Sequence, residues 1–179
     1  DHLADAMGYF QSQRPSRLLV VDRTLRASLE QSYPVLQFVP GREVCHLVVL
    51  EDTTADARAW NTVPRELAAG LADRGVPVTY GLFDGSPARF LLADGSTVCE
   101  LADWDDVRQG LLLLLFSEGK RLVRRAAARV LDDLALWPRV AWMDFREPQF
   151  WGACAALPAA RGLLTFPATP QGLLDMSRA

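Results

Sequence analysis

The chain has 179 residues, enough for one domain with a substantial hydrophobic core, and its 50% hydrophobic and 23% charged content is ordinary for a globular protein. Its formal net charge of −3 argues against a nucleic-acid-binding surface, which usually carries an excess of basic residues. The longest apolar run, residues 111–116, is too short to span a bilayer, so we expect neither nucleic acid nor a membrane as partner.

The N-terminal part is predicted to contain a linker or tail of a preceding region (1–16), a strand (17–21), a helix (22–32) and an extended segment (35–39). Leu25 and Leu29 lie four residues apart in the predicted helix, and the turn dipeptide Pro40-Gly41 closes the extended segment. We expect residues 17–43 to form a lead-in segment packed on the domain that follows.

From residue 44 onward the pattern becomes regular. Strands are predicted at 45–50, 76–83, 111–116, 139–143 and 161–166, a hairpin at 89–93 and 97–101 closed by Asp94-Gly95, and helices at 56–74, 121–136, 150–157 and 170–176. Within the first helix, Pro64 is expected to begin the helix proper, with Thr62 as its N-cap. Strands alternating with helices predict an α/β domain over 44–179: a doubly wound, mainly parallel sheet with helices on both faces, a Rossmann-like three-layer sandwich.

Two of the predicted strands end at acidic and hydroxyl side chains. The runs 45–50 and 111–116 are apolar without alternation, which is typical of strands buried on both faces. Asp52, Thr54 and Asp56 follow the first run, and Glu118 follows the second. Ligands of open α/β sheets bind outside the carboxyl ends of the strands, so these residues are the candidate site. Their oxygens suit Mg²⁺, although the same residue types also serve as ordinary helix caps.

The loop Asp52-x-Thr54-x-Asp56 resembles the DxSxS metal-adhesion loop of the von Willebrand factor A (vWA) fold, and Glu118 resembles the acid of that fold's second metal loop. Asp56 stands where the family has its second serine, and the threonine of the family's intermediate loop has no match. The resemblance extends over roughly residues 16–176, through the stretches 17–27, 34–40, 137–144 with Trp151-Gly152, and 166–174. These look like the vWA-like domains of bacterial multidomain proteins in conflict, defence and signalling systems.

The resemblance implies a non-catalytic protein–protein interaction or scaffolding role, with a protein of the same system as partner. It implies Mg²⁺ held by Asp52, Thr54 and Asp56, with Glu118 binding directly or through water and a partner carboxylate completing the site. The departures from the motif favour loss of the metal. One alternative is a metal-dependent phosphohydrolase or nuclease using Asp52 and Glu118; a haloacid dehalogenase-like loop would, however, need an acid where Thr54 stands. A third interpretation is that the domain is a purely structural module, in which the acids at the strand ends cap helices.

The aromatic residues Trp60, Trp142, Phe150 and Trp151 are expected mostly in the core. Alternatively, Trp151 forms an exposed patch with Phe145 and Phe150. Because aromatic residues and arginine are enriched at protein interfaces, Arg146, Phe150 and Trp151 are the candidate partner-binding residues.

Cys45 and His46 are neighbours on a strand, so they point to opposite faces and cannot form a catalytic pair. Cys45, Cys99 and Cys154 lie far apart without metal-binding spacing, and we expect reduced thiols in a cytoplasmic protein. The chain starts at Asp1 without Met, and we expect it to be part of a longer polypeptide.

Overall fold

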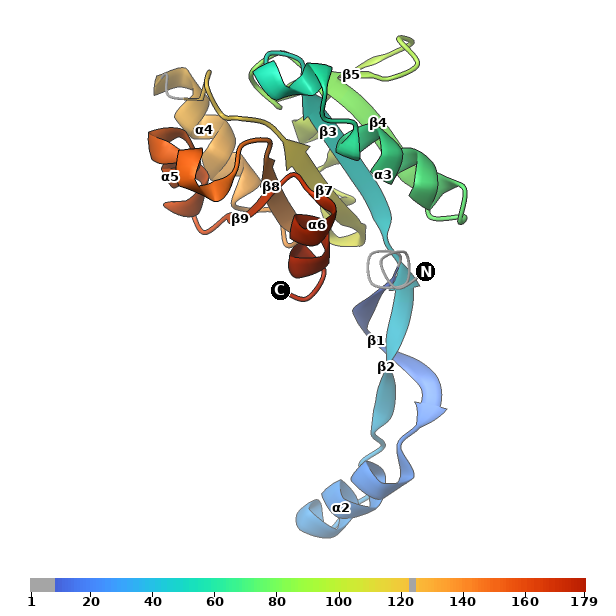
Figure 1. Ribbon diagram of the computed structural model, residues 1–179. Coiled ribbons are helices and arrows are strands. Elements are labelled where there is room, and N and C mark those ends of the chain that lie inside the picture. The colour runs from blue at the N-terminus through green and yellow to red at the C-terminus, as the bar shows by residue number, and fades with distance from the viewer. Residues whose placement is uncertain (1–8, 123–124) are drawn as a thin grey trace. The chain divides into compact units, whose positions relative to one another are not determined.

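A computed structural model describes residues 9–122 and 125–179, and the described chain forms two compact units. We call residues 45–179 the sheet unit and residues 9–44 the hairpin unit; both are drawn in Figure 1. None of the helices in the described ranges combines the length and apolar character needed to cross a membrane.

The sheet unit is built on a seven-stranded sheet with the strand order β6-β5-β4-β3-β7-β8-β9 (Figure 1). Its strands are β3 (His46–Asp52), β4 (Val78–Phe83), β5 (Arg89–Leu92), β6 (Val98–Glu100), β7 (Leu111–Phe116), β8 (Val140–Asp144) and β9 (Leu164–Pro167). The strands from β4 to β9 in this order run parallel, and β5 and β6 add an antiparallel edge. The predicted α/β fold with a mainly parallel sheet is therefore confirmed.

Two helices of the sheet unit lie inside their predicted ranges (56–74 and 121–136) and are shorter, the third begins and ends two residues later than the predicted 150–157, and the last matches the predicted 170–176. These helices are α3 (Val63–Ala72), α4 (Arg125–Leu134), α5 (Gly152–Ala159) and α6 (Pro170–Met176), with short 3₁₀ turns η1 (Asp56–Ala59), η2 (Leu101–Trp104), η3 (Arg108–Gly110) and η4 (Pro148–Phe150). The predicted helix 56–74 is divided into η1 and α3, because Pro64 can only occupy a first turn. The predicted two-residue turn at Asp94-Gly95 is wrong: residues 93–97 connect β5 to β6, and Asp94 Oδ1 accepts from Ser96 N at 2.9 Å.

Alternate residues of β3 and β7 enter two separate cores, which is why both strands are apolar throughout. One core includes Val48, Leu50, Leu113 and Leu115 with Leu131 and Leu134 of α4. The other includes Leu47, Val49, Leu114 and Phe116 with Leu67 and Leu71 of α3 and Leu173 of α6. Burying one such side chain contributes about 1.5–3 kcal/mol to the stability of the unit.

The chain changes direction in the sheet between β3 and β7. It leaves β3 through α3 to reach β4 on one side, and it leaves β7 through α4 to reach β8 on the other side. The two neighbouring strands are parallel, so their carboxyl ends lie side by side while their connections diverge. This is the topological switch point at which open α/β sheets bind ligands.

The hairpin unit pairs β1 (Tyr9–Leu19) with β2 (Phe38–Val44) in an antiparallel ribbon, and α2 (Val21–Gln31) connects them. Residues 9–16 of the predicted linker or tail lie in β1, and Pro40-Gly41 lies inside β2, so the expected turn at this dipeptide is wrong. Pro40 is opposite Pro15, where the register shifts, so the missing N–H groups fall at irregular positions of the ladder. The expected packing of 17–43 on the domain stays a prediction.

Candidate functional site

The buried polar side chains of the described chain lie together at the carboxyl ends of three neighbouring strands. β3 ends with Glu51 and Asp52, Ser117 and Glu118 follow β7, and β8 ends with Asp144. A buried charge is costly unless it is paired or hydrogen-bonded, so the partners of these five residues define what the site can do.

Asp52 accepts hydrogen bonds from three different loops. Its Oδ1 accepts from Thr54 N at 2.9 Å, from Thr54 Oγ1 at 2.7 Å and from Gly85 N at 3.2 Å, and its Oδ2 accepts from Ser117 Oγ at 2.6 Å. Ser117 Oγ in turn accepts from Gly119 N at 2.9 Å. The Asp52 carboxylate therefore joins the loops after β3, β4 and β7, and both of its oxygens are already engaged.

Glu118 is paired with a lysine that also contacts Asp56. Lys120 Nζ lies 2.7 Å from Glu118 Oε2 and 2.5 Å from Asp56 Oδ2, and Glu118 Oε1 accepts from Ala57 N at 3.0 Å. The hydrogen bonds from Lys120 to Asp56 and to Glu118 raise the pKa of the lysine, which favours its ammonium form. A positive charge thus stands between the two carboxylates that were predicted to share a metal ion.

Asp144 holds Arg146 in a fixed position. Its Oδ2 lies 2.6 Å from Arg146 Nη2 and its Oδ1 accepts from Arg146 Nε at 3.0 Å, while Arg146 Nη2 also donates to the backbone oxygen of Glu118 at 2.8 Å. The indole N–H of Trp151 donates to Arg146 O at 2.9 Å. Arg146, predicted as a partner-binding residue, therefore connects the loops after β7 and β8.

Glu51 belongs to a second network, on the α3 side of the sheet, that sequence reasoning missed. Glu51 Oε1 forms ion pairs with Arg58 Nε at 2.8 Å and with Arg65 Nη2 at 3.3 Å. The Tyr80 hydroxyl donates to Glu51 Oε2, and burial followed by this hydrogen bond raises the pKa of Tyr80. The sequence held one signal for this network. Leu47, Val49 and Glu51 alternate along β3 and therefore share one face, on which the acid follows two core residues.

The predicted metal ligands do not form a set that fits Mg²⁺. Thr54 donates a hydrogen bond to Asp52, whereas Asp56 and Glu118 both pair with the Lys120 ammonium. Over residues 9–122 and 125–179, no group of three or more His, Cys, Asp or Glu side chains is arranged to hold a metal ion. Mg²⁺ requires near-octahedral oxygen ligands at about 2.0–2.1 Å, and the oxygens here already face N–H and O–H donors.

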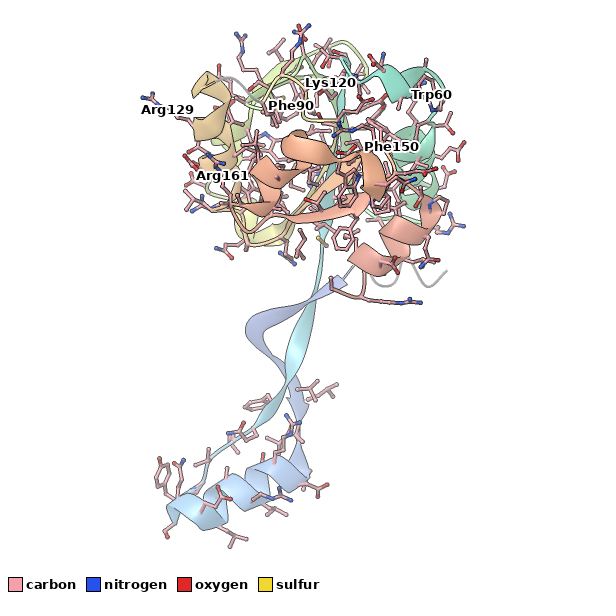
Figure 2. The ribbon with its side chains drawn as sticks, turned by 60° about the vertical axis from the view of Figure 1, so that its left-hand side comes forward. Trp60, Phe90, Lys120, Arg129, Phe150 and Arg161 are labelled. Atoms are coloured by element: carbon pink, nitrogen blue, oxygen red, sulfur yellow. The ribbon has the colours of Figure 1, made fainter. Side chains whose placement is uncertain are left out.

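The aromatic residues near these strand ends differ in exposure. Trp142 is buried as predicted, and its Nε1 donates to Ser117 O at 3.0 Å. Trp151 is half-buried, but Phe150 on η4 is 65% exposed. The prediction of a core position for Trp60 is wrong, since this residue directly follows η1 and is 73% exposed. Figure 2 shows Trp60, Lys120 and Phe150 toward the same end of the sheet unit.

Cys45 is buried and Cys99 is half-buried, and both are free thiols. The side chain of Cys154 lies outside the described residues.

Comparisons of the chain with protein-family models, with curated proteins and with solved structures give no match.

Proposed function

We propose that the sheet unit is a vWA-like, non-catalytic interaction or scaffolding domain of a larger bacterial defence or signalling protein, and that its protein partner binds at the carboxyl ends of β3, β7 and β8. The observation that carries the proposal is the pair of exposed aromatic side chains, Trp60 and Phe150, on loops that follow two of these strands. Large aromatic residues supply much of the binding energy at protein interfaces.

The buried hydrogen-bond network at the strand ends supports rigid loops around Trp60 and Phe150. Asp52 and Glu118 each join their own strand end to a neighbouring loop, and Asp144 holds Arg146, which donates to the backbone of the loop after β7. Loops held in this way lose little conformational entropy when a partner binds, which favours affinity. The acids then act by positioning the loops.

The proposal does not depend on a metal ion. Lys120 supplies the positive charge between Asp56 and Glu118, and the donors around Asp52 satisfy both of its oxygens. The same arrangement weakens the alternative of a metal-dependent phosphohydrolase or nuclease, because such a site needs open carboxylate oxygens for its ions and a group that activates water.

The experiment is site-specific photo-crosslinking in the full-length protein, in the cells that produce it. A benzophenone amino acid replaces Trp60 or Phe150, and Leu136 serves as the control position. The exposed fraction of Leu136, 64%, matches the 65% of Phe150, but Leu136 lies in the segment between α4 and β8, before β8 begins.

We expect an adduct with one and the same protein at positions 60 and 150 and none at position 136. Equal crosslinking at all three positions, or none at 60 and 150, would contradict the proposal and favour a purely structural module.

A further inference from the structure

The helix of the hairpin unit presents an apolar ridge that nothing in its own unit covers. Val21, Leu25 and Leu29 recur every four residues, so they form one continuous ridge along α2. Their exposed fractions are 59%, 58% and 82%, and no residue of α2 is buried. An isolated helix of 11 residues is marginal in water, and helices in proteins owe most of their stability to packing of an apolar face.

The contacts within the hairpin unit leave this ridge open. Thr24 Oγ1 accepts from Gln37 N at 2.9 Å and Ser28 Oγ accepts from Val35 N at 2.9 Å, so these hydroxyls face the returning chain. On a helical projection the ridge lies next to the face that carries the two hydroxyls, and it does not face residues 35–37 of the returning chain. These hydrogen bonds orient α2, but they bury little apolar surface.

The strands of the hairpin unit are less suited to docking than its helix. An open strand edge is blunted by proline and by irregularities of the ladder. Pro15 and Pro40 lie opposite each other, and the register shifts on both sides of Pro15. The ridge of α2 has no comparable protection.

The charges beside the ridge can pair with the same charges on a second copy of the helix. Asp22, Arg26 and Glu30 form a second four-residue row next to the ridge, and their signs alternate. In a twofold-symmetric antiparallel pair of helices, this row faces the same row of the other copy. A twofold axis midway between Asp22 and Arg26 places each Arg26 opposite Asp22 of the second copy. An axis midway between Arg26 and Glu30 places each Arg26 opposite Glu30 of the second copy.

Both placements also fit the apolar ridge. The first sets Leu25 between Val21 and Leu25 of the second copy, and the second sets Leu29 between Leu25 and Leu29 of the second copy. This interdigitation of four-residue ridges is the commonest packing of helices in globular proteins.

We propose that α2 is a self-association surface, on which the α2 helix of a second copy of this chain packs antiparallel. The helix is about 16 Å long at about 1.5 Å per residue, and the contact is smaller than the roughly 800 Å² per partner of a standard interface. The association is therefore weak and concentration-dependent, with a Kd of about 1 μM or more. The proposal does not rest on the function of the sheet unit.

The test is a charge-reversal experiment on the 179-residue chain by sedimentation velocity over a concentration series. One variant carries Arg26→Glu, and the other carries Asp22→Arg with Glu30→Arg. In each variant alone the facing rows repel, and we expect association to weaken about tenfold or more. An equimolar mixture restores opposite charges across the helix pair, and we expect it to associate at least as well as the wild-type chain.

Rescue in the mixture separates an intermolecular contact from damage to the helix, because reversed charges within one helix are not relieved by mixing. Arg23→Glu is the matched control: it makes the same charge change on the far side of α2 and should leave association unchanged. Leu29→Asp should abolish association. A wild-type chain that stays monomeric throughout, association that survives Arg26→Glu, or a mixture without rescue would each overturn the proposal.

Discussion

The sheet unit and the hairpin unit use apolar side chains in opposite ways. In β3 and β7 the leucines and valines lie between two layers of the same chain, and most have no exposed surface. In the hairpin unit no described residue between 18 and 39 is buried, although α2 carries a regular apolar ridge. The first unit completes its core by itself, whereas the second has apolar surface that only another molecule or another part of the protein can cover.

The largest difference between the units should come from truncating one leucine in each of them. Leu114→Ala removes a side chain with no exposed surface, and we expect it to lower the free energy of unfolding by about 3–5 kcal/mol. Leu29→Ala removes one that is 82% exposed, and at concentrations where the chain is monomeric we expect a change within about 0.5 kcal/mol. Urea unfolding of both variants measures the difference. A cost above about 2 kcal/mol for Leu29→Ala would show that the hairpin unit has a core of its own.

A smaller effect should separate buried from exposed acids at the strand ends. Asp52→Ala leaves the donors of Thr54, Gly85 and Ser117 without their acceptor, and we expect a loss of roughly 2–4 kcal/mol in the free energy of unfolding. Asp56→Ala is the matched control, because its side chain is 77% exposed and its contact with Lys120 is near the surface; we expect a loss below about 1 kcal/mol. Equal losses would mean that the Asp52 network does not join the loops.

The smallest effect concerns the pH dependence of the free energy of unfolding. It distinguishes the two units, because the hairpin unit contains no histidine. Burial lowers the pKa of His46, whose Nε2 lies 2.9 Å from Thr79 Oγ1 and whose ring is near Trp104. At this histidine the unfolded chain then binds a proton more readily than the folded one. The contribution of His46 to the free energy of unfolding is therefore complete above about pH 6.5 and is lost as the pH falls below that value. The five tryptophans all belong to the sheet unit, so their fluorescence reports its unfolding.

In His46→Gln the decline between about pH 6.5 and pH 5 should be absent, while the carboxylates still cause unfolding at lower pH. An unchanged decline in this variant would assign the pH dependence to other groups.

Much of the fold was predictable because its signals are local. The apolar runs that became β3 and β7, the position of Pro64 and the spacing of Leu25 and Leu29 all concern neighbours in the chain. The candidate site was predicted only in part. Asp52 and Glu118 do lie at adjacent strand ends, but the roles of Lys120 and Glu51 depend on residues far away in sequence. Trp60 was assigned to the core because a large aromatic residue usually is buried, whereas in the structure it follows η1 and is exposed.

The sequence by itself determined that this protein forms a mainly parallel α/β sheet with acids at the carboxyl ends of its buried strands. Unbroken apolar runs indicate strands buried on both faces, and helices between successive strands favour parallel pairing. Only the tertiary structure decided what those acids contact. Carboxylates at a switch point bind either an ion or the donors of the protein itself, and the choice depends on which N–H, O–H and ammonium groups the loops bring within about 3 Å. Here the loops bring Thr54, Gly85 and Ser117 to Asp52, and Lys120 to Asp56 and Glu118.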